Sequence, residues 1–358
     1  MTGPRDPFRA AISDAVATLN PGYFALVMGT GIISIAMWDN GHHALSRAMF
    51  AVAIVSWVVL AVLHCWRIAA FWRLLRADFT DPRRGFGFFT FVAATDVVGA
   101  RAALEGFRVP AICLLALGAL TWFVLGYVVP WTAVLNPSIR PALGGANGSW
   151  FIWVVASQSV AVLTAALEPT MHTGRRVFAL VAVFSWGVGA FLYAAVAVLV
   201  IARLLLYKLE PTDFTPVYWV AMGATAITVL AGARIVQMAD APMVAATRGL
   251  IAGSSVIFWV FGTWLIPVLV AAAWWRHITH RIPLVYDATL WSIIFPLGMY
   301  AVASYYLGHV DRLPIVGDIG SGMAWVAFGA WVVVFTAMVW HLLTTLVLRR
   351  RLHTTPVR

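Results

Sequence analysis

The chain has 358 residues, of which 62% are hydrophobic and only 11% are charged. A soluble domain normally carries about 25% charged residues, so this composition excludes an ordinary soluble protein and indicates an integral membrane protein. The formal net charge is +10. Membrane topology accounts for this charge, as described below, and we therefore expect a lipid bilayer, and not nucleic acid, as the partner of this basic chain.

The N-terminal segment, residues 1–20, contains no apolar run of the kind that marks a signal peptide. Its apolar residues recur at helical spacing, at Phe8, Ile12, Val16 and Leu19. This pattern predicts a short helix lying on the membrane surface. The rest of the chain divides into a transmembrane domain, residues 21–348, and a basic tail, residues 349–358.

Ten segments are long and apolar enough, or nearly so, to cross a bilayer core of about 30 Å, which takes roughly 20 helical residues. They are predicted at residues 21–38, 47–66, 86–103, 110–135, 149–167, 176–207, 214–234, 248–275, 285–307 and 323–348. The connections are short, and none contains a second domain. The sequence therefore predicts an all-α integral membrane protein with ten transmembrane helices.

The basic residues predict how this domain is oriented. Of the 24 Lys and Arg residues, 16 fall on the side of the two termini, and Arg67, Arg73, Arg76, Arg83 and Arg84 are the richest internal cluster. Connections on the cytoplasmic side carry such an excess. We therefore expect a multi-pass protein of the plasma membrane with the N-terminal segment and the basic tail both cytoplasmic.

An internal repeat runs through the odd-numbered segments. An aromatic residue recurs at Phe24, Phe89, Phe151, Tyr218 and Trp291. Four residues later stand Met28, Ala93, Val155, Met222 and Phe295, and these are followed directly by Gly29, Ala94, Ala156, Gly223 and Pro296. The repeating unit is one helical hairpin, present five times in tandem.

The repeat predicts a central pore. Every hairpin enters the membrane from the same side, so its copies are related by rotation about the membrane normal, and five such copies form a ring around an axis. Small and hydroxyl-bearing side chains of the odd segments would line that axis, with candidates at Gly29, Thr30, Thr95, Ser157, Gln158, Ser159, Thr225 and Thr228. The alternative is close packing, because small residues also let membrane helices approach one another.

Three stretches resemble the tellurite-resistance/dicarboxylate transporter family, which includes slow anion channels of plant guard cells and a bacterial tellurite-resistance anion channel. They are GYFALVMGTGIIS from Gly22, LWSIIFPLGMYAVAS from Leu290 and, more loosely, TFVAATDVVGAR from Thr90. The resemblance implies odd helices inside and even helices outside, and a homotrimer with one pore per subunit. It also implies that Phe295, beside Pro296, closes the pore, with Met28, Ala93, Val155 and Met222 completing the constriction.

Three charged residues lie within or near the ends of predicted helices. Asp96 is in the middle of a segment, where a charge is too costly to face lipid, so it is a candidate protonation site or else a structural hydrogen-bond partner between helices. Arg101 and Arg234 lie near outer helix ends, where they would attract anions or reach the headgroups. The adjacent pair His42–His43 is a weak metal pattern, and we expect no metal and no cofactor.

The first functional hypothesis is a channel for small anions gated by Phe295. The alternative is a secondary carrier or exporter of C4-dicarboxylates, sulfite or tellurite, coupled to protons through Asp96. An enzyme is not expected, because the chain has no HExxH or GxSxG motif.

Overall fold

The computed structural model describes residues 7–135, 141–238 and 242–345, and every regular element in these ranges is a helix. Ten helical spans are long and apolar enough to cross a membrane, as predicted. The inner helices are α2 (Ala25–Asp39), α5 (Phe89–Leu104), α7 (Phe151–Leu167), α9 (Val220–Ile235) and α11 (Trp291–Val310). The outer helices are α3 (His43–Ala70), α6 (Arg108–Leu135), α8 (Arg175–Leu206), α10 (Pro242–Trp274) and α12 (Pro314–Leu343).

The outer helices extend further than their apolar stretches. Helix α10 begins six residues and helix α12 nine residues before the predicted start. Both begin at a proline, a residue that is favoured in the first turn of a helix. Two short helices precede or join the spans: α1 (Pro7–Ala17) falls within the predicted N-terminal segment, and α4 (Trp72–Thr80) forms in what we predicted as a plain connection. The basic tail, residues 349–358, lies outside the described residues.

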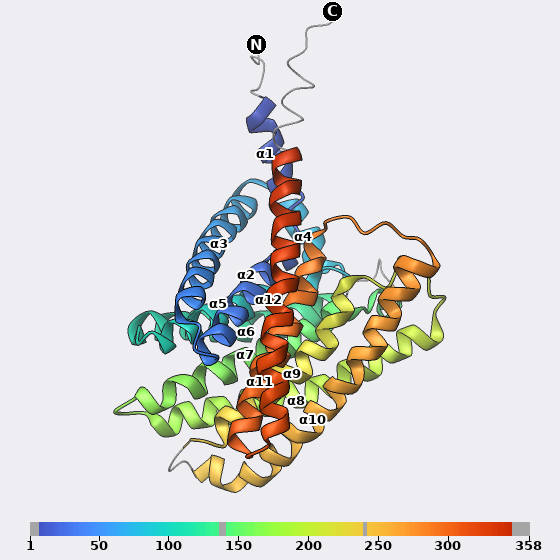
Figure 1. Ribbon diagram of the computed structural model, residues 1–358. Helices are drawn as coiled ribbons and strands as arrows, with labels where there is room; N and C mark the ends of the chain where they lie inside the picture. Colours follow the sequence, from blue (N-terminus) through green and yellow to red (C-terminus); the bar gives the residue numbers. More distant parts are fainter. Residues whose placement is uncertain (1–6, 136–140, 239–241, 346–358) are drawn as a thin grey trace, which may run out of the picture.

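The inner helices form a closed ring. Helix α2 packs on α5, α5 on α7, α7 on α9, α9 on α11, and α11 again on α2. The most apolar stretches of the inner spans are 78–89% buried, against 11–28% for the outer spans. The prediction that odd segments lie inside and even segments outside is therefore confirmed, and Figure 1 shows the long outer helices crossing over this core.

Each inner helix begins with a tight 3₁₀ turn. These turns are η1 (Pro21–Phe24), η2 (Gly85–Phe88), η4 (Gly148–Trp150), η6 (Pro216–Trp219) and η8 (Ala288–Leu290). In all five copies the turn ends within one residue of the aromatic residue that marks the sequence repeat. The repeat seen in the sequence thus corresponds to a structural repeat, to within one residue at the turn.

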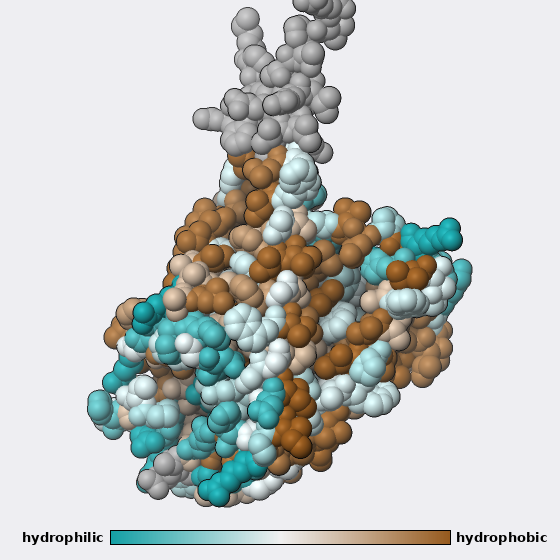
Figure 2. Space-filling view, viewed as in Figure 1, coloured by the Kyte–Doolittle hydropathy of each residue, from teal (hydrophilic) through white to brown (hydrophobic). Residues whose placement is uncertain are grey.

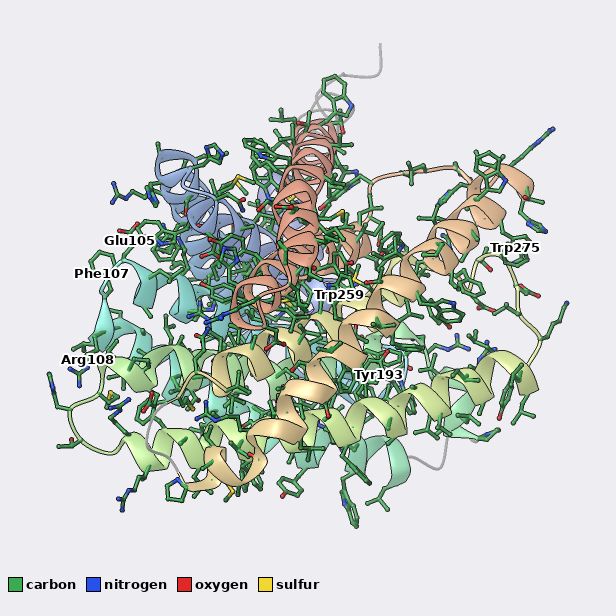
Figure 3. All side chains as sticks on the ribbon, turned by 60° about the horizontal axis from the view of Figure 1, so that its bottom comes forward. Glu105, Phe107, Arg108, Tyr193, Trp259 and Trp275 are labelled. Atoms are coloured by element: carbon green, nitrogen blue, oxygen red, sulfur yellow. The ribbon has the colours of Figure 1, made fainter. Side chains whose placement is uncertain are left out.

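Indole hydrogen bonds join each hairpin to the next. The Nε1–H of a tryptophan on every outer helix donates to an oxygen on the following inner helix, at 2.8–3.1 Å. The pairs are Trp57 with Thr95 Oγ1, Trp122 with Ser157 Oγ, Trp186 with the Thr228 carbonyl, Trp259 with Ser304 Oγ, and Trp331 with Thr30 Oγ1. The last pair links the fifth hairpin to the first, so the series closes the ring. Figure 3 labels Trp259, which lies on the outer helix α10.

Glycines let the inner helices approach closely. A Cβ atom on Gly31 of α2 would lie 2.6 Å from Val97 Cγ1 of α5, and one on Gly298 of α11 would lie 2.7 Å from Ile32 Cγ2 of α2. Both distances are too short for a real contact, so a larger side chain would push these helices apart. Close packing, the alternative reading of the small residues, accounts for these glycines.

The surface of the bundle is mostly apolar. Large hydrophobic side chains are exposed along all five outer helices, for example Phe191 of α8 and Trp340 of α12. Figure 2 shows apolar residues across the middle of the visible face, with hydrophilic residues gathered mainly at its lower left and at its right. This distribution fits a bundle whose sides face lipid.

We predict that the indole bonds stabilise the closed ring. Trp331→Phe removes the bond that joins the fifth hairpin to the first and is expected to lower the free energy of unfolding by about 1 kcal/mol. Combined with Thr30→Val, it should cost less than the sum of the two single changes, because both remove one bond. Unfolding in detergent micelles measures this coupling. Trp340→Phe, at a position 70% exposed, is the matched control, and strictly additive losses would contradict the prediction.

Candidate functional site

A cavity opens where the five inner helices begin. It has a volume of about 200 Å³, and we call it the inner vestibule. All five copies of the repeat contribute to its wall: Asn20, Gly22, Arg83, Arg84, Gly87, Asn147, Ser149, Ile152, Thr215, Val217, Ala288, Thr289 and Ser292. Since the starts of all five inner helices meet at this cavity, the inner helices are parallel and the vestibule lies on their common axis.

A second, smaller cavity lies between the later halves of the same five helices. Its volume is about 20 Å³, which is enough for roughly one water molecule. We call it the outer cavity, and it is lined by Ile32, Ile35, Asp96, Val97, Ala100, Ser159, Val162, Ile227, Leu230 and Met299. Apart from Asp96 and Ser159, its wall is apolar.

Each inner helix carries one residue of the repeat between its contributions to the two cavities, and we call these five residues the closed layer. It consists of the residues four positions after each repeat aromatic: Met28, Ala93, Val155, Met222 and Phe295. On every inner helix the residues lining the inner vestibule precede this layer, and those lining the outer cavity follow it. All five layer residues are at most 2% exposed. These five residues thus lie between the two cavities along their helices, at the level where the sequence predicts a constriction.

Helix α11 is held on both sides at this layer. A Cβ atom on Gly29 of α2 would lie 3.1 Å from Ile294 Cγ2 and 3.4 Å from the Phe295 backbone nitrogen. On the other side, a Cβ atom on Gly223 of α9 would lie 2.9 Å from Pro296 Cγ. The small residues of the repeat therefore make room for the part of α11 that carries Phe295.

The predicted lining residues of the repeat mostly face the outer helices. The hydroxyls of Thr30, Thr95 and Ser157 accept the indole bonds described above. Gln158 Nε2 donates to the Trp186 carbonyl of α8, and Thr225 Oγ1 donates to a carbonyl of its own helix and lies against Gly262 of α10. These polar groups bond or pack between helices, and they line neither cavity.

Asp96 lies in the wall of the outer cavity and is 1% exposed. Its Oδ2 atom is 2.7 Å from Ser159 Oγ, and its Oδ1 atom has no hydrogen-bond partner. The Ser159 hydroxyl also lies 2.9 Å from the Ala156 carbonyl, and its single proton serves only one of the two acceptors. A protonated Asp96 that donates to Ser159 would satisfy both contacts.

Arg101 is fully buried between α2, α3 and α5 and lines neither cavity. Its Nε atom donates to Ser34 Oγ and Ser46 Oγ, and its Nη2 atom lies 2.8 Å from Glu105 Oε1. The guanidinium carbon also stands 4.5 Å from the centre of the Trp38 ring. With its charge balanced by Glu105, Arg101 holds helices together.

Arg234 stands at the end of α9 and is half-buried. It donates to Tyr306 Oη at 2.6 Å, and Tyr306 in turn donates to Asp39 Oδ1 at 3.1 Å. This chain of polar groups joins the ends of α9, α11 and α2. Like Arg101, Arg234 is absent from the walls of both cavities.

Sequence reasoning missed two arginines of the site. Arg83 and Arg84 line the inner vestibule, whereas in the sequence they served only as signals of topology. Arg84 pairs with Asp78 at 3.1 Å, and the same carboxylate pairs with Arg67 at 2.6 Å, so two cations share one anion. The sequence feature that could have identified them is their position immediately before an inner helix. Residues at that position lie at the mouth of any pore along the axis.

The fold and the site define a membrane transport protein: parallel inner helices in a closed ring, a cavity at each end of their axis, and a closed layer between. The chain belongs to the SLAC1 family, described as voltage-dependent anion channel, whose profile matches residues 18–339. It is thus a member of a family of membrane transporters of anions.

Relatives of this chain have been found in bacteria and archaea. An uncharacterized membrane protein of Mycobacterium tuberculosis is 64% identical over 156 residues, which cover 44% of this chain and 79% of that protein. Two uncharacterized transporters of Methanocaldococcus jannaschii are 26% and 25% identical; each match covers 89% of this chain, and 92% and 93% of the relatives. The archaeal similarity thus spans all five hairpins.

We predict that Glu105 stabilises the fold by balancing Arg101. The hydrogen bond from Arg101, followed by that from Arg47, lowers the pKa of the Glu105 carboxyl. Because the folded-state pKa is lowered, this contribution is present above the unfolded pKa of about 4.3 and is lost as pH falls through the folded-state value. Glu105→Gln should therefore reduce stability at pH 7, by roughly 2 kcal/mol, and flatten the loss of stability towards acid.

Thermal unfolding of the purified protein between neutral and acidic pH measures this contribution. Glu210→Gln is the control, because its partner Lys208 is 86% exposed and an exposed ion pair contributes little. Equal effects of the two substitutions would contradict the role of Glu105.

Proposed function

We propose that this protein conducts small anions along the axis of its inner helices and that Phe295 is the gate. The observation that carries the proposal is the closed layer between the inner vestibule and the outer cavity. Phe295 is the only aromatic residue among its five members. Ala93 and Val155 are small, and Met28 and Met222 are flexible side chains, so we expect that movement of the one rigid ring opens a path.

Hydrophobic gating explains how such a layer stops ions. An anion passing the layer loses its hydration and finds no polar group there, so an apolar constriction is a barrier without any fixed charge. Pro296 supports movement at this point because it lacks the N–H that would bond to the preceding turn. Met28 and Met222 are flexible side chains that adapt to a displaced ring.

The proposed path uses three parts of the site. The inner vestibule collects anions from the cytoplasm, the closed layer admits them when Phe295 moves, and the outer cavity leads outwards past Asp96 and Ser159. The protein works as a homotrimer in the plasma membrane with both termini cytoplasmic. The parallel arrangement of the hairpins favours a channel, since many carriers are built from inverted repeats.

The second candidate is a secondary carrier for C4-dicarboxylates, sulfite or tellurite that couples transport to protons through Asp96. One observation favours it: Asp96 is buried in the wall of the outer cavity, has no ion-pair partner among the described residues, and leaves one carboxyl oxygen without a hydrogen bond. A buried ionisable group of this kind on a transport path is a common proton carrier.

Removal of the ring tests the gate. Phe295→Ala is expected to increase the anion current in planar bilayers at least about tenfold, equivalent to lowering the barrier by ~1.4 kcal/mol. Currents of chloride, nitrate and malate are compared with those of the wild type. Phe191→Ala, at a position 78% exposed on α8, should leave them unchanged. Equal currents in the wild type and Phe295→Ala, with both proteins folded, would refute the gate.

Transport measured as a function of pH tests the role of Asp96. If the protein couples anions to protons, Asp96→Asn should remove the pH dependence of malate or sulfite uptake into vesicles while preserving the fold, since asparagine retains the hydrogen bond to Ser159. Asp318→Asn, an exposed position on α12, is the control. Full pH dependence in Asp96→Asn would leave Asp96 with a purely structural role.

A further inference from the structure

We infer that the inner vestibule is a specific binding site for one small anion, a loading site in front of the closed layer. The inference deepens the proposed anion conduction and rests on it for its role in transport. The binding site is formed by residues at the starts of the inner helices, whereas the proposed gate belongs to the closed layer. Three independent features of the vestibule support it.

The first feature is the convergence of helix N-termini. The five inner helices are 15 to 20 residues long and all begin around the vestibule. Each N-terminus carries a partial positive charge of roughly half an elementary charge, and backbone N–H groups at such ends bind anions. Glycine permits the close approach of two of these ends, since a Cβ atom on Gly148 would lie 2.4 Å from the Val217 carbonyl oxygen.

The second feature is a buried hydroxyl without a partner. Ser149 lines the vestibule and is 6% exposed, and its Oγ atom makes no hydrogen bond within the described residues. Ser292, from the fifth copy of the repeat, also lines the vestibule and is 6% exposed. A buried donor without an acceptor is unfavourable, and an anion in the vestibule would supply the acceptor.

The third feature is the charge of the wall. Arg83 and Arg84 line the vestibule, and none of its lining residues is acidic. Three carboxylates lie beside the wall: Asp78 pairs with Arg84, Asp81 accepts from the Arg83 backbone N–H, and Asp287 accepts from the Thr289 backbone N–H. Arg84 shares Asp78 with Arg67, so its charge is only partly balanced. The residues that form the wall itself carry two positive side chains and no negative one.

Size and hydration define the class of ligand. A volume of about 200 Å³ holds a chloride or nitrate ion with several waters, or one small carboxylate. A second cavity, of about 470 Å³, shares Thr215 and Thr289 with the vestibule and gives access from the loop that follows α10. A bound anion therefore waits one helical turn before the closed layer, partly hydrated and held by hydroxyls and arginines.

Binding to the closed protein tests the site without any conduction. Calorimetric titration of the full chain in detergent with sodium nitrate, against sodium gluconate for ionic strength, measures the dissociation constant. Ser149→Ala with Ser292→Ala, and separately Arg83→Gln, should each weaken nitrate binding by about tenfold, a change of ~1.4 kcal/mol. Ser254→Ala on α10 and Arg73→Gln on α4, which line neither cavity, should leave the dissociation constant unchanged.

The same variants in the Phe295→Ala protein separate this inference from the proposed function. Currents that persist with an unchanged dissociation constant in all variants would overturn the loading site and leave anion conduction intact. Nitrate binding that depends on Ser149 and Arg83, in a protein without any anion current, would keep the binding site and refute conduction. Absence of nitrate binding to the wild type would overturn the loading site directly.

Discussion

The structure depends on the need to satisfy polar groups inside a bilayer, where no water is available to do so. Five tryptophans of the outer helices meet that need by donating to oxygens of the neighbouring inner helices. Because each bond joins one hairpin to the next and the last joins the fifth to the first, the same interactions that satisfy these groups also close the ring. The axis along which an anion would pass is a consequence of that closure.

Closing the ring leaves an axis with different chemistry at its two ends. The 3₁₀ turns bring five helix starts, two arginines and two buried serines to the inner vestibule. Between the later halves of the helices only a small outer cavity remains, and its wall is apolar apart from Asp96 and Ser159. The closed layer lies between, where Gly29 and Gly223 admit the backbone of α11 around Phe295 and Pro296. The arginine-lined vestibule and the buried residues around Phe295 therefore belong to successive turns of the same five helices.

Much of the architecture was predictable from the sequence. The ten spans and the five-fold repeat followed from hydropathy and spacing, which are local properties, and the family resemblance implied the inner position of the odd segments. The side-chain directions were not predictable in this way. Thr30, Thr95 and Ser157 were predicted to line the axis, yet their hydroxyls bond to Trp331, Trp57 and Trp122. A recurring small polar residue fits an axis or a helix contact equally well, and its sequence neighbours do not tell which face it occupies.

Ten membrane spans and five copies of one hairpin could be predicted from the sequence alone, because the length of an apolar stretch and the period of a repeat depend only on consecutive residues. The tertiary structure decided what the charged groups do. It buried Arg101 against Glu105, placed Asp96 at the outer cavity and brought Arg83 and Arg84 to the inner vestibule. Such roles depend on which helices meet around a residue. The closure of the ring, which brings together segments far apart in the sequence, decides which helices meet.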